Sequence, residues 1–368
     1  MKTTITRSCA IVSTARVKQL CGLFEVSPTE RTGETWEVDL PIEGLDWNVG
    51  LIVGPSGSGK STVAQDLFGD HLVQGYDWPA DKALVDGFPA GMGIKEITGL
   101  LSSVGFSSPP SWLRPFRVLS NGEQFRATIA RALAEEPDLA VVDEFTSVID
   151  RQVARIGSAA VAKAVRRRKQ KFIAVTCHYD VADWLCPDWV LEMPSGTFTR
   201  RSLQRRPAIE LEVRRVHSDT WKLFCAHHYL NTSLHKAATC FVAFVGGTPA
   251  AFASVLPFPH PKQPGWREHR TVCLPDYQGV GVGNALSDFV ASLFKARGDY
   301  RSTTSSPAMT WHRAKSPVWE MIRKPELMWG RHEGKPAMRR TASINRLTAG
   351  FRYVGPARPD DARGFGVI

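Results

Sequence analysis

Residues 54–62 read Gly-Pro-Ser-Gly-Ser-Gly-Lys-Ser-Thr and fit the pattern Gly-x-x-x-x-Gly-Lys-Ser/Thr. They follow an apolar strand-like run at 50–53 and precede a helical stretch. Glycines allow backbone N–H groups to curl around phosphate oxygens, and the N-terminus of the next helix points at the same charge. The pattern therefore predicts a P-loop for ATP, with Lys60 on the β- and γ-phosphates and Ser61 on Mg²⁺. Its predicted binding residues are Gly54, Ser56, Gly57, Ser58, Gly59, Lys60, Ser61 and Thr62.

Further motifs follow in chain order. Residues 119–124 read Leu-Ser-Asn-Gly-Glu-Gln, the apolar run at 139–142 ends in Asp143-Glu144, residues 147–150 read Ser-Val-Ile-Asp, and His178 ends another strand-like run. Together with the P-loop they resemble, across nearly the whole first half, the signature, Walker B, D-loop and switch histidine of ABC ATPases. The resemblance implies an ATPase in which Asp143 holds Mg²⁺ through water, Glu144 is the general base for the attacking water and His178 senses the γ-phosphate.

In ABC ATPases the signature of one protomer completes the ATP site of another. The resemblance therefore implies a nucleotide-dependent homodimer in which Ser120, Gly122 and Asp150 contribute to ATP binding. The motif departs from the family at two positions, since Asn121 replaces a usual Gly and Glu123 replaces the Gln of transporters.

Two other family features have weaker candidates. Asp86 is the nearest candidate for the Q-loop residue, and Phe24 is the candidate for the aromatic side chain that stacks on adenine.

The second half contains another glycine-spaced loop, Gln-Gly-Val-Gly-Val-Gly-Asn at 278–284, between a strand-like run and a helix that continues from Ala285. It fits Gln/Arg-x-x-Gly-x-Gly/Ala and resembles the acyl-CoA pyrophosphate loop of the GNAT acyltransferases; the alternative is a structural turn without a ligand. Backbone N–H groups of such a loop can hold a pyrophosphate. The predicted binding residues are Gln278, Gly279, Val280, Gly281, Val282, Gly283 and Asn284.

GNAT chemistry needs a neutral amine, a backbone N–H for the developing oxyanion and an acid for the leaving thiolate. Glu268, on the strand before the loop, is the predicted general base, whereas His269 alternates to the opposite face. The tyrosine that usually serves as the acid is missing, and His312, Ser305 or Ser306 could replace it. Residues 227–229, His-His-Tyr, would lie near the acceptor side, where a packed aromatic cluster is the alternative.

The elements that position these motifs indicate two domains. Residues 10–200 alternate strand-like runs, including Gly-Leu-Phe-Glu-Val at 22–26, with helical stretches, which is typical of an α/β domain with a mostly parallel sheet. A basic, proline-closed stretch follows, and then a pattern of strand, helix at 218–230, hairpin turning at Gly246-Gly247, strand, loop and helix. We predict an ABC-type P-loop domain at 1–200, a linker at 201–208 and an α+β GNAT-like domain at 209–368.

Composition limits the possible classes of protein. No stretch approaches ~18 apolar residues, and the first 20 residues lack the apolar segment of a signal peptide, so we expect a cytoplasmic protein without a membrane span. The seven cysteines form no C-x-x-C pair, which argues against a zinc site and a disulfide framework. The net charge of +10 lies entirely in residues 207–368, with 22 Lys and Arg against 12 Asp and Glu. This surplus is equally compatible with an acidic partner or phosphate-bearing cofactor and with a merely solvated basic surface.

The combination resembles a class of ABC-ATPase/acetyltransferase fusions. The leading hypothesis is an ATP-dependent N-acyltransferase that uses acetyl-CoA or another acyl-CoA and modifies a base in DNA or RNA, because a base amine must leave the stack before chemistry. Arg166–Lys169 and the Trp-His-Arg run at 311–313, with a similar one at 329–332, are compatible with nucleic acid but also with a solvated surface. The alternatives are a protein or small-amine acetyltransferase with a regulatory ATPase, and a nucleotide-gated DNA-binding or transport-coupling module with an inactive GNAT fold.

Overall fold

The computed structural model describes residues 1–27, 31–201, 208–228, 233–259, 263–327 and 347–368. The chain forms two compact units. Unit 1 comprises residues 1–76, 135–148 and 164–206, and unit 2 comprises residues 77–134, 149–163 and 207–368. This division cuts across the predicted boundary at residue 200, because the segment that carries the signature motif belongs to unit 2 with the second half of the chain.

Unit 1 is built on a six-stranded sheet in the order β4-β5-β6-β3-β7-β8. Its strands are β3 (Val49–Val53), β4 (Leu72–Val73), β5 (Leu139–Val142), β6 (Lys171–Thr176), β7 (Trp189–Glu192) and β8 (Thr197–Arg200). All neighbours pair in parallel except β7 and β8, which pair antiparallel. The sheet is joined by α2 (Lys60–Phe68), η1 (Gly69–His71) and α7 (Val181–Leu185). Strand β3 is buried at every position, as expected for an apolar run in a parallel sheet.

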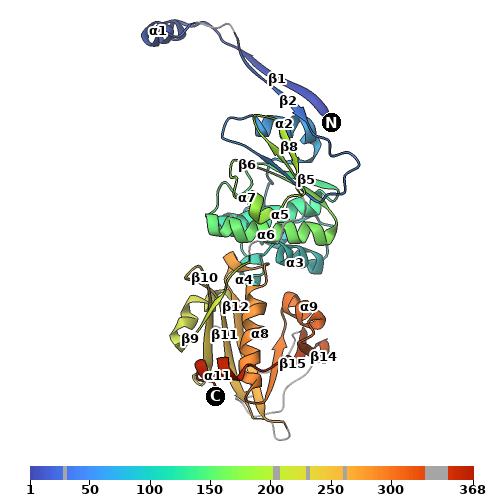
Figure 1. Ribbon diagram of the computed structural model, residues 1–368, viewed down its shortest axis with the longest axis vertical. Coiled ribbons are helices and arrows are strands. Elements are labelled where there is room, and N and C mark those ends of the chain that lie inside the picture. The colour runs from blue at the N-terminus through green and yellow to red at the C-terminus, as the bar shows by residue number, and fades with distance from the viewer. Residues whose placement is uncertain (28–30, 202–207, 229–232, 260–262, 328–346) are drawn as a thin grey trace. The chain divides into compact units, whose positions relative to one another are not determined.

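A long hairpin extends from unit 1. Strands β1 (Lys2–Ala10) and β2 (Arg31–Asp39) pair antiparallel, and α1 (Ala15–Phe24) lies between them at the far end of the hairpin, away from α2 (Figure 1). The predicted strand at 22–26 is therefore wrong, because Thr14 caps a helix that runs to Phe24. None of the residues of α1 is buried, and Phe24 is 72% exposed. Phe24 lies at the tip of the arm, so its assignment to an adenine site is also wrong.

The first part of unit 2 is helical. It contains η2 (Leu84–Gly87), α3 (Ile94–Ser103), α4 (Pro109–Trp112), η3 (Phe116–Val118), α5 (Asn121–Glu135) and the first part of α6 (Arg151–Arg168). Its buried apolar side chains include Leu100, Phe106 and Trp112, and the indole N–H of Trp112 donates to the Phe106 carbonyl at 3.1 Å.

The rest of unit 2 is a seven-stranded sheet in the order β14-β15-β13-β12-β11-β10-β9. The strands are β9 (Glu212–Val216), β10 (Thr239–Val245), β11 (Thr248–Phe258), β12 (Gly265–Cys273), β13 (Asp299–Thr304), β14 (Trp319–Leu327) and β15 (Leu347–Tyr353). Strands β12 and β13 pair in parallel, and their neighbours pair antiparallel. The predicted hairpin turn is confirmed, since Gly246 and Gly247 both have positive φ, as a two-residue hairpin loop requires.

Both faces of this sheet are covered. Helix α8 (Val282–Lys295) packs on one face, where Leu286, Val290 and Phe294 join the core beneath β10 and β11. On the other face, η4 (Ser218–Leu223) and η5 (Cys225–His227) bring Trp221 and Phe224 against the sheet. The predicted helix at 218–230 is thus two short 3₁₀ turns. The further elements in the described part of the unit are helices α9 (Pro307–Lys315) and α11 (Pro359–Gly364) and the turn η6 (Pro275–Tyr277).

Most of the predicted linker, residues 202–207, lies outside the described residues. Among the helices that the structure describes, none combines the length and the apolar character that a membrane crossing requires. The seven cysteines are free thiols.

Candidate functional site

The first candidate site lies at one edge of the sheet in unit 1. Strands β3, β5 and β6 are parallel, with Val53 opposite Thr176 and Val142 opposite Ala174, so their carboxyl ends reach the same edge. The P-loop, the Asp143-Glu144 pair and His178 follow these three ends. Ligands of open parallel sheets bind at such carboxyl ends.

The P-loop has the geometry that phosphate binding requires. Gly57 and Gly59 have φ of +78° and +86°, and Gly59 caps the N-terminus of α2, where free N–H groups attract an anion. Lys60 is 7% exposed and donates from Nζ to the Pro55 carbonyl at 2.7 Å, across the loop. The buried Ser58 hydroxyl has no hydrogen-bond partner within the described part of the chain. An orphaned hydroxyl in a glycine-rich turn fits a phosphate oxygen, so ATP with Mg²⁺ suits these residues.

The Walker B residues form a strained turn directly after β5. Glu144 and Thr146 have φ of 50° and 70°, and Ser147 donates to the Glu144 carboxylate at 2.5 Å. Backbone conformations of this kind are concentrated at functional sites. Asp143 accepts from the Glu144 backbone N–H at 2.8 Å, and the backbone N–H of His178 is bonded to the Thr176 hydroxyl. Glu144 is exposed, as a group that contacts substrate water must be.

The structure adds a residue that the sequence interpretation overlooked. Gln74 directly follows β4, whose Leu72 and Val73 pair with Val141 and Val142 of β5. Gln74 therefore lies at the same carboxyl edge as Asp143 and is exposed, whereas Asp86 lies in the 3₁₀ turn η2 of unit 2. The sequence signal for this residue was a glutamine that lies between the P-loop helix and the signature segment, directly after a short apolar run. We propose Gln74 as the Q-loop residue in place of Asp86.

The signature residues open helix α5 of unit 2. Ser120 and Glu123 form a capping box: the Ser120 backbone N–H and hydroxyl donate to the Glu123 carboxylate at 3.0 and 3.1 Å, and the Glu123 N–H donates to the Ser120 hydroxyl. Ser111 donates to the other carboxylate oxygen at 2.7 Å. Glu123, which stands where transporters have Gln, therefore has a structural role as the capping carboxylate of this helix. Ser120 and Asn121 are exposed, Gly122 is buried, and Asp150 caps α6 through the Gln152 N–H at 2.8 Å.

The second candidate site is the loop before α8. Gly279 and Gly281 have φ of +85° and +104°, which favours glycine, and Gly281 caps the helix. The loop from Val280 leads into this helix N-terminus, whose backbone N–H groups fit the pyrophosphate of an acyl-CoA, except for the Gly283 N–H, which is bonded to the Cys273 thiol. The Gln278 side chain is instead occupied within the protein, because it donates to the Cys273 carbonyl at 2.8 Å and accepts from the Ser107 N–H.

A buried polar cluster lies where β12 and β13 part. The two strands pair only from Gly265 to Arg267, and beyond this point Glu268 accepts from Thr271, Ser287 and Ser302 and from Arg313 at 2.9 and 3.0 Å. Burial opposes ionisation of Glu268, but the charge of Arg313 and these hydrogen bonds outweigh it and hold the pKa of Glu268 below its usual range. These donors occupy both carboxylate oxygens of Glu268. The prediction that Glu268 is the general base does not fit this geometry.

His269 is also unsuited to that role. It is the extra residue of a β-bulge, since Ser254 pairs with Arg270 and Val255 with Glu268. Its Nε2 accepts from the His235 backbone N–H, and burial together with Arg270 and Arg267 lowers the pKa of His269 to about 3. Because of the bulge, the His269 backbone has no partner position in the regular pairing of β11 with β12. A backbone N–H that donates to a substrate carbonyl must likewise lie outside regular strand pairing.

His312 is the better-placed of the predicted acids. Its Nε2 lies 3.5 Å from Asp288 Oδ2, and Trp319 Nε1 donates to Asp288 Oδ1 at 2.7 Å. Ser306 instead caps α9 by accepting from Met309. Of residues 227–229, His227 and the buried His228 are described, and burial lowers the pKa of His227; Tyr229 lies outside the described residues, as does the run at 329–332.

A parallel sheet with a glycine loop, an acidic strand end and a histidine at one edge is the arrangement of a P-loop NTPase. The sequence is 30% identical over 200 residues to the energy-coupling factor transporter ATP-binding protein EcfA1 of Listeria innocua, covering 44% of this chain and 69% of that protein. It is 29% identical over 224 residues to the Fe(3+) ions import ATP-binding protein FbpC of Serratia marcescens, covering 48% of this chain. The chain therefore belongs to the ABC ATPase family.

The model of the Acetyltransferase (GNAT) family matches residues 204–312, so a GNAT domain is fused to the C-terminal side of the ATPase. The chain spans 64% of the length of the iron import protein and 58% of an aliphatic sulfonates import ATP-binding protein of Frankia alni. A solved dimeric ATP-binding cassette, in a post-hydrolysis state with ADP and phosphate, is 20% identical with a TM-score of 0.37, covering 45% of this chain and 92% of that chain.

Proposed function

We propose that this chain is an ATP-dependent N-acyltransferase. The observation that carries the proposal is the presence of two glycine loops at helix N-termini, one at Gly57 and Gly59 and one at Gly279 and Gly281, each with positive φ. The first fits the phosphates of ATP, and the second fits the pyrophosphate of an acyl-CoA, which supplies the acyl thioester. Acetyl-CoA is the proposed donor.

On the ATPase side, Lys60 would neutralise the β- and γ-phosphates, Ser61 and Asp143 would hold Mg²⁺, and Glu144 would take a proton from the attacking water. The signature residues Ser120 and Gly122, with Asp150, would complete the site of a second protomer. A cytoplasmic homodimer is therefore part of the proposal.

The proposed acceptor is an amine that is uncharged at neutral pH. A lysine amine, with a pKa near 10.4, must lose a proton before it can attack, and this requires a general base. Glu268 is saturated by hydrogen bonds, and His269 has its Nε2 engaged and a pKa of about 3. The exocyclic amine of a nucleobase is already neutral, so no proton has to leave before attack, and one N–H proton passes to the leaving thiolate as the amide forms. This contrast favours a base in DNA or RNA over a protein lysine.

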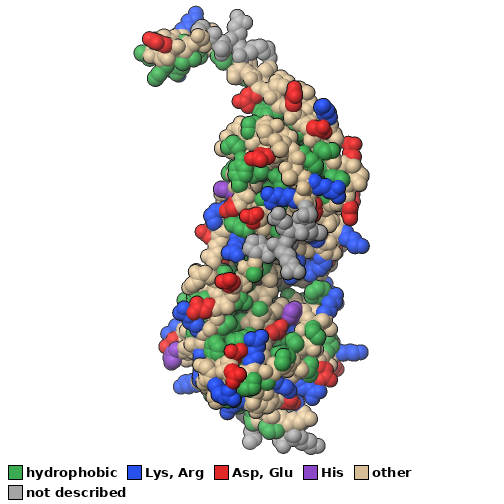
Figure 2. Space-filling view, viewed as in Figure 1, with side chains coloured by type: hydrophobic (Ala, Val, Ile, Leu, Met, Phe, Trp, Pro, Cys, Tyr) green, Lys and Arg blue, Asp and Glu red, His purple; other side chains and the backbone are tan. Residues whose placement is uncertain are grey.

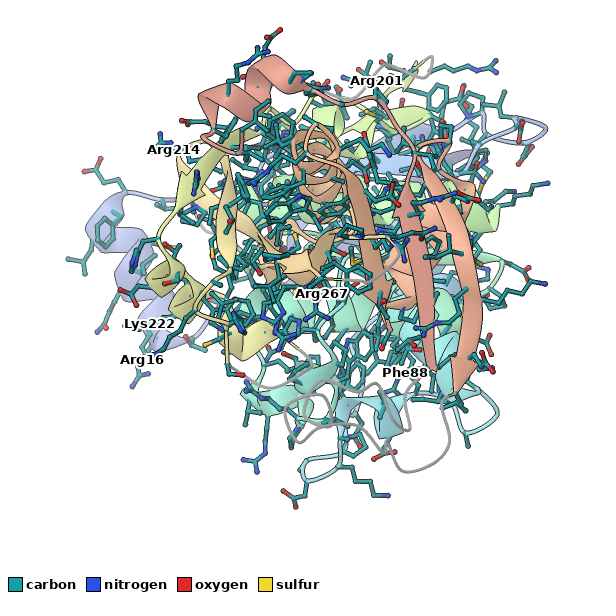
Figure 3. The ribbon with its side chains drawn as sticks, turned by 90° about the horizontal axis from the view of Figure 1, so that it is seen from below. Arg16, Phe88, Arg201, Arg214, Lys222 and Arg267 are labelled. Atoms are coloured by element: carbon teal, nitrogen blue, oxygen red, sulfur yellow. The ribbon has the colours of Figure 1, made fainter. Side chains whose placement is uncertain are left out.

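The charge distribution gives this acceptor only modest support. Lys and Arg side chains are interspersed with Asp and Glu on the visible face (Figure 2), and Arg214, Lys222 and Arg267 are well separated on β9, η4 and β12 (Figure 3). Arg166, in the basic run ending α6, is paired with Asp188 at 3.0 Å. Phosphate contacts would therefore be distributed rather than gathered in one patch.

One observation favours the alternative of an inactive GNAT fold. Arg313 is fully buried between Glu268 and the Trp319 ring, with its guanidinium 4.3 Å from the ring centroid, so the point where the strands part is filled by protein. In that case the chain would be a nucleotide-gated binding or transport-coupling module. The protein or small-amine acetyltransferase with a regulatory ATPase remains the other alternative.

ATP hydrolysis by the wild type and by Glu144→Gln, with and without DNA or RNA and with acetyl-CoA present, tests the proposal. We expect nucleic acid to stimulate the wild type, and Glu144→Gln to lower the rate by about 10²–10⁴-fold because it removes the general base. Glu37→Gln, an exposed change on β2, is the matched control and should hydrolyse ATP normally. Mass spectrometry of the nucleosides then detects the added acyl group. Absence of stimulation by either polymer would exclude the nucleic-acid acceptor.

A further inference from the structure

The signature motif and the acyl-CoA loop touch within unit 2. Asp276, in the turn η6 just before the loop, has its Oδ1 3.6 Å from Nη1 of Arg126, which lies one turn after Gly122 in α5. A Cβ atom placed on Gly122 would lie 3.3 Å from the same Asp276 oxygen. The carboxylate of Asp276 therefore packs directly against the signature glycine.

A second contact is made by the acyl-CoA loop itself. Gln278, its first residue, accepts a hydrogen bond from the backbone N–H of Ser107, which precedes α4. The backbone of Gly279 packs so closely on Gly105 that a Cβ atom at Gly279 would lie 2.6 Å from the Gly105 Cα. Both backbone positions have positive φ, so the contact depends on glycine on each side. The start of the acyl-CoA loop and the segment before the signature helix are thus packed backbone to backbone.

The guanidinium of Arg126 makes this contact sensitive to displacement. Its side chain is fully buried, and its nitrogens have no hydrogen-bond partner among the residues that the structure describes. Burial lowers the pKa of Arg126, and the charge of Asp276 opposes that shift. Moving Asp276 away from Arg126 would remove the largest compensating charge from a buried guanidinium and leave the weaker influence of Glu123, which is unfavourable. The N-terminal turn of α5 and the turn η6 must therefore move together.

We infer that the contact between Asp276 and Arg126 links ATP engagement at the signature motif to acyl-CoA binding at the loop. The inference rests on the proposed function, in which both ligands bind. ATP held against Ser120 and Gly122 orders the N-terminal turn of α5, and Asp276 and Gln278 transmit this order to the loop. Linkage is reciprocal, so each ligand raises the affinity of the other by the same factor.

The test measures the dissociation constant of acetyl-CoA by titration calorimetry with and without ATP and Mg²⁺. The background is Glu144→Gln, in which ATP persists. We expect ATP to lower this constant by about fivefold or more, the lower end of common coupling energies. Adding Asp276→Asn to this background should bring the ratio of the two acetyl-CoA dissociation constants, without and with ATP, close to one. The control Asp299→Asn changes a carboxylate of β13 that pairs with Lys295 and Arg301, and it should leave the ratio as in the parent.

The double variant Arg126→Met/Asp276→Asn removes both charges and covers a failure of the single variant to fold. A ratio that stays fivefold in either variant, or acetyl-CoA binding that ATP does not change in the parent, overturns the inference while the proposed acyl-CoA site stands. No acetyl-CoA binding by the wild type under either condition overturns the proposed function and the inference with it.

Discussion

Replacing Glu268 by Gln distinguishes a structural carboxylate from a catalytic one. Glu268→Gln keeps the shape of the side chain but removes the charge that compensates Arg313, a guanidinium with 1% of its side chain exposed. Breaking a buried ion pair by changing one partner costs about 3–5 kcal/mol. At about 2–4 °C per kcal/mol for a domain of this size, the melting temperature of unit 2 should fall by roughly 10 °C.

The assay is thermal unfolding followed by circular dichroism and calorimetry, together with the pH dependence of acyl transfer. Glu268→Gln/Arg313→Met removes the orphaned charge and should recover at least half of the lost stability, because replacing both partners of a buried pair is often close to neutral. If Glu268→Gln melts like the wild type but loses acyl transfer and the alkaline rise of its pH profile, the structural assignment of Glu268 is wrong and the general-base prediction stands.

Three other changes have definite expected outcomes. Glu123→Ala removes the capping box and the bond from Ser111, and should lower the free energy of urea unfolding by about 1–2 kcal/mol. The folded His269 stays neutral down to a pKa of about 3, whereas the unfolded state gains a proton at 6.5, so wild-type stability falls as the pH drops below 6.5. His269→Gln should not show this loss, which amounts to about 1–2 kcal/mol of unfolding free energy at pH 5 in urea titrations. An equal pH dependence of the unfolding free energy in the wild type and the variant would contradict the prediction. Replacing residues 11–27 by a short turn should leave the melting temperature of unit 1 within about 2 °C, since α1 buries nothing.

The geometry of the two glycine loops was predictable because their signals are local. A glycine pattern between a strand and a helix specifies its own backbone geometry, and the positive φ at Gly57, Gly59, Gly279 and Gly281 agrees with that expectation. The hairpin at Gly246-Gly247 was predictable for the same reason.

Other features depend on contacts that the sequence does not display. Alternation along β12 marks Glu268 as facing α8 but cannot show that Arg313, 45 residues later, is buried against it. The run at 22–26 has strand-forming residues, but the Thr14 cap begins a helix that includes most of it. The beginning of unit 2 at Asp77 could not be read from the sequence. It results from contacts of the signature segment with Gln278 and Asp276 in the second half of the chain.

The close packing at Gly59 has a practical consequence. A Cβ atom on this glycine would lie 2.3 Å from Cε2 of Trp36, a side chain of β2 that is 8% exposed. The indole thus lies directly beneath the turn that would receive the phosphates, in surroundings to which its emission is sensitive. Trp36 is a built-in optical reporter, and the fluorescence difference between the wild type and Trp36→Phe would follow nucleotide loading without an attached dye.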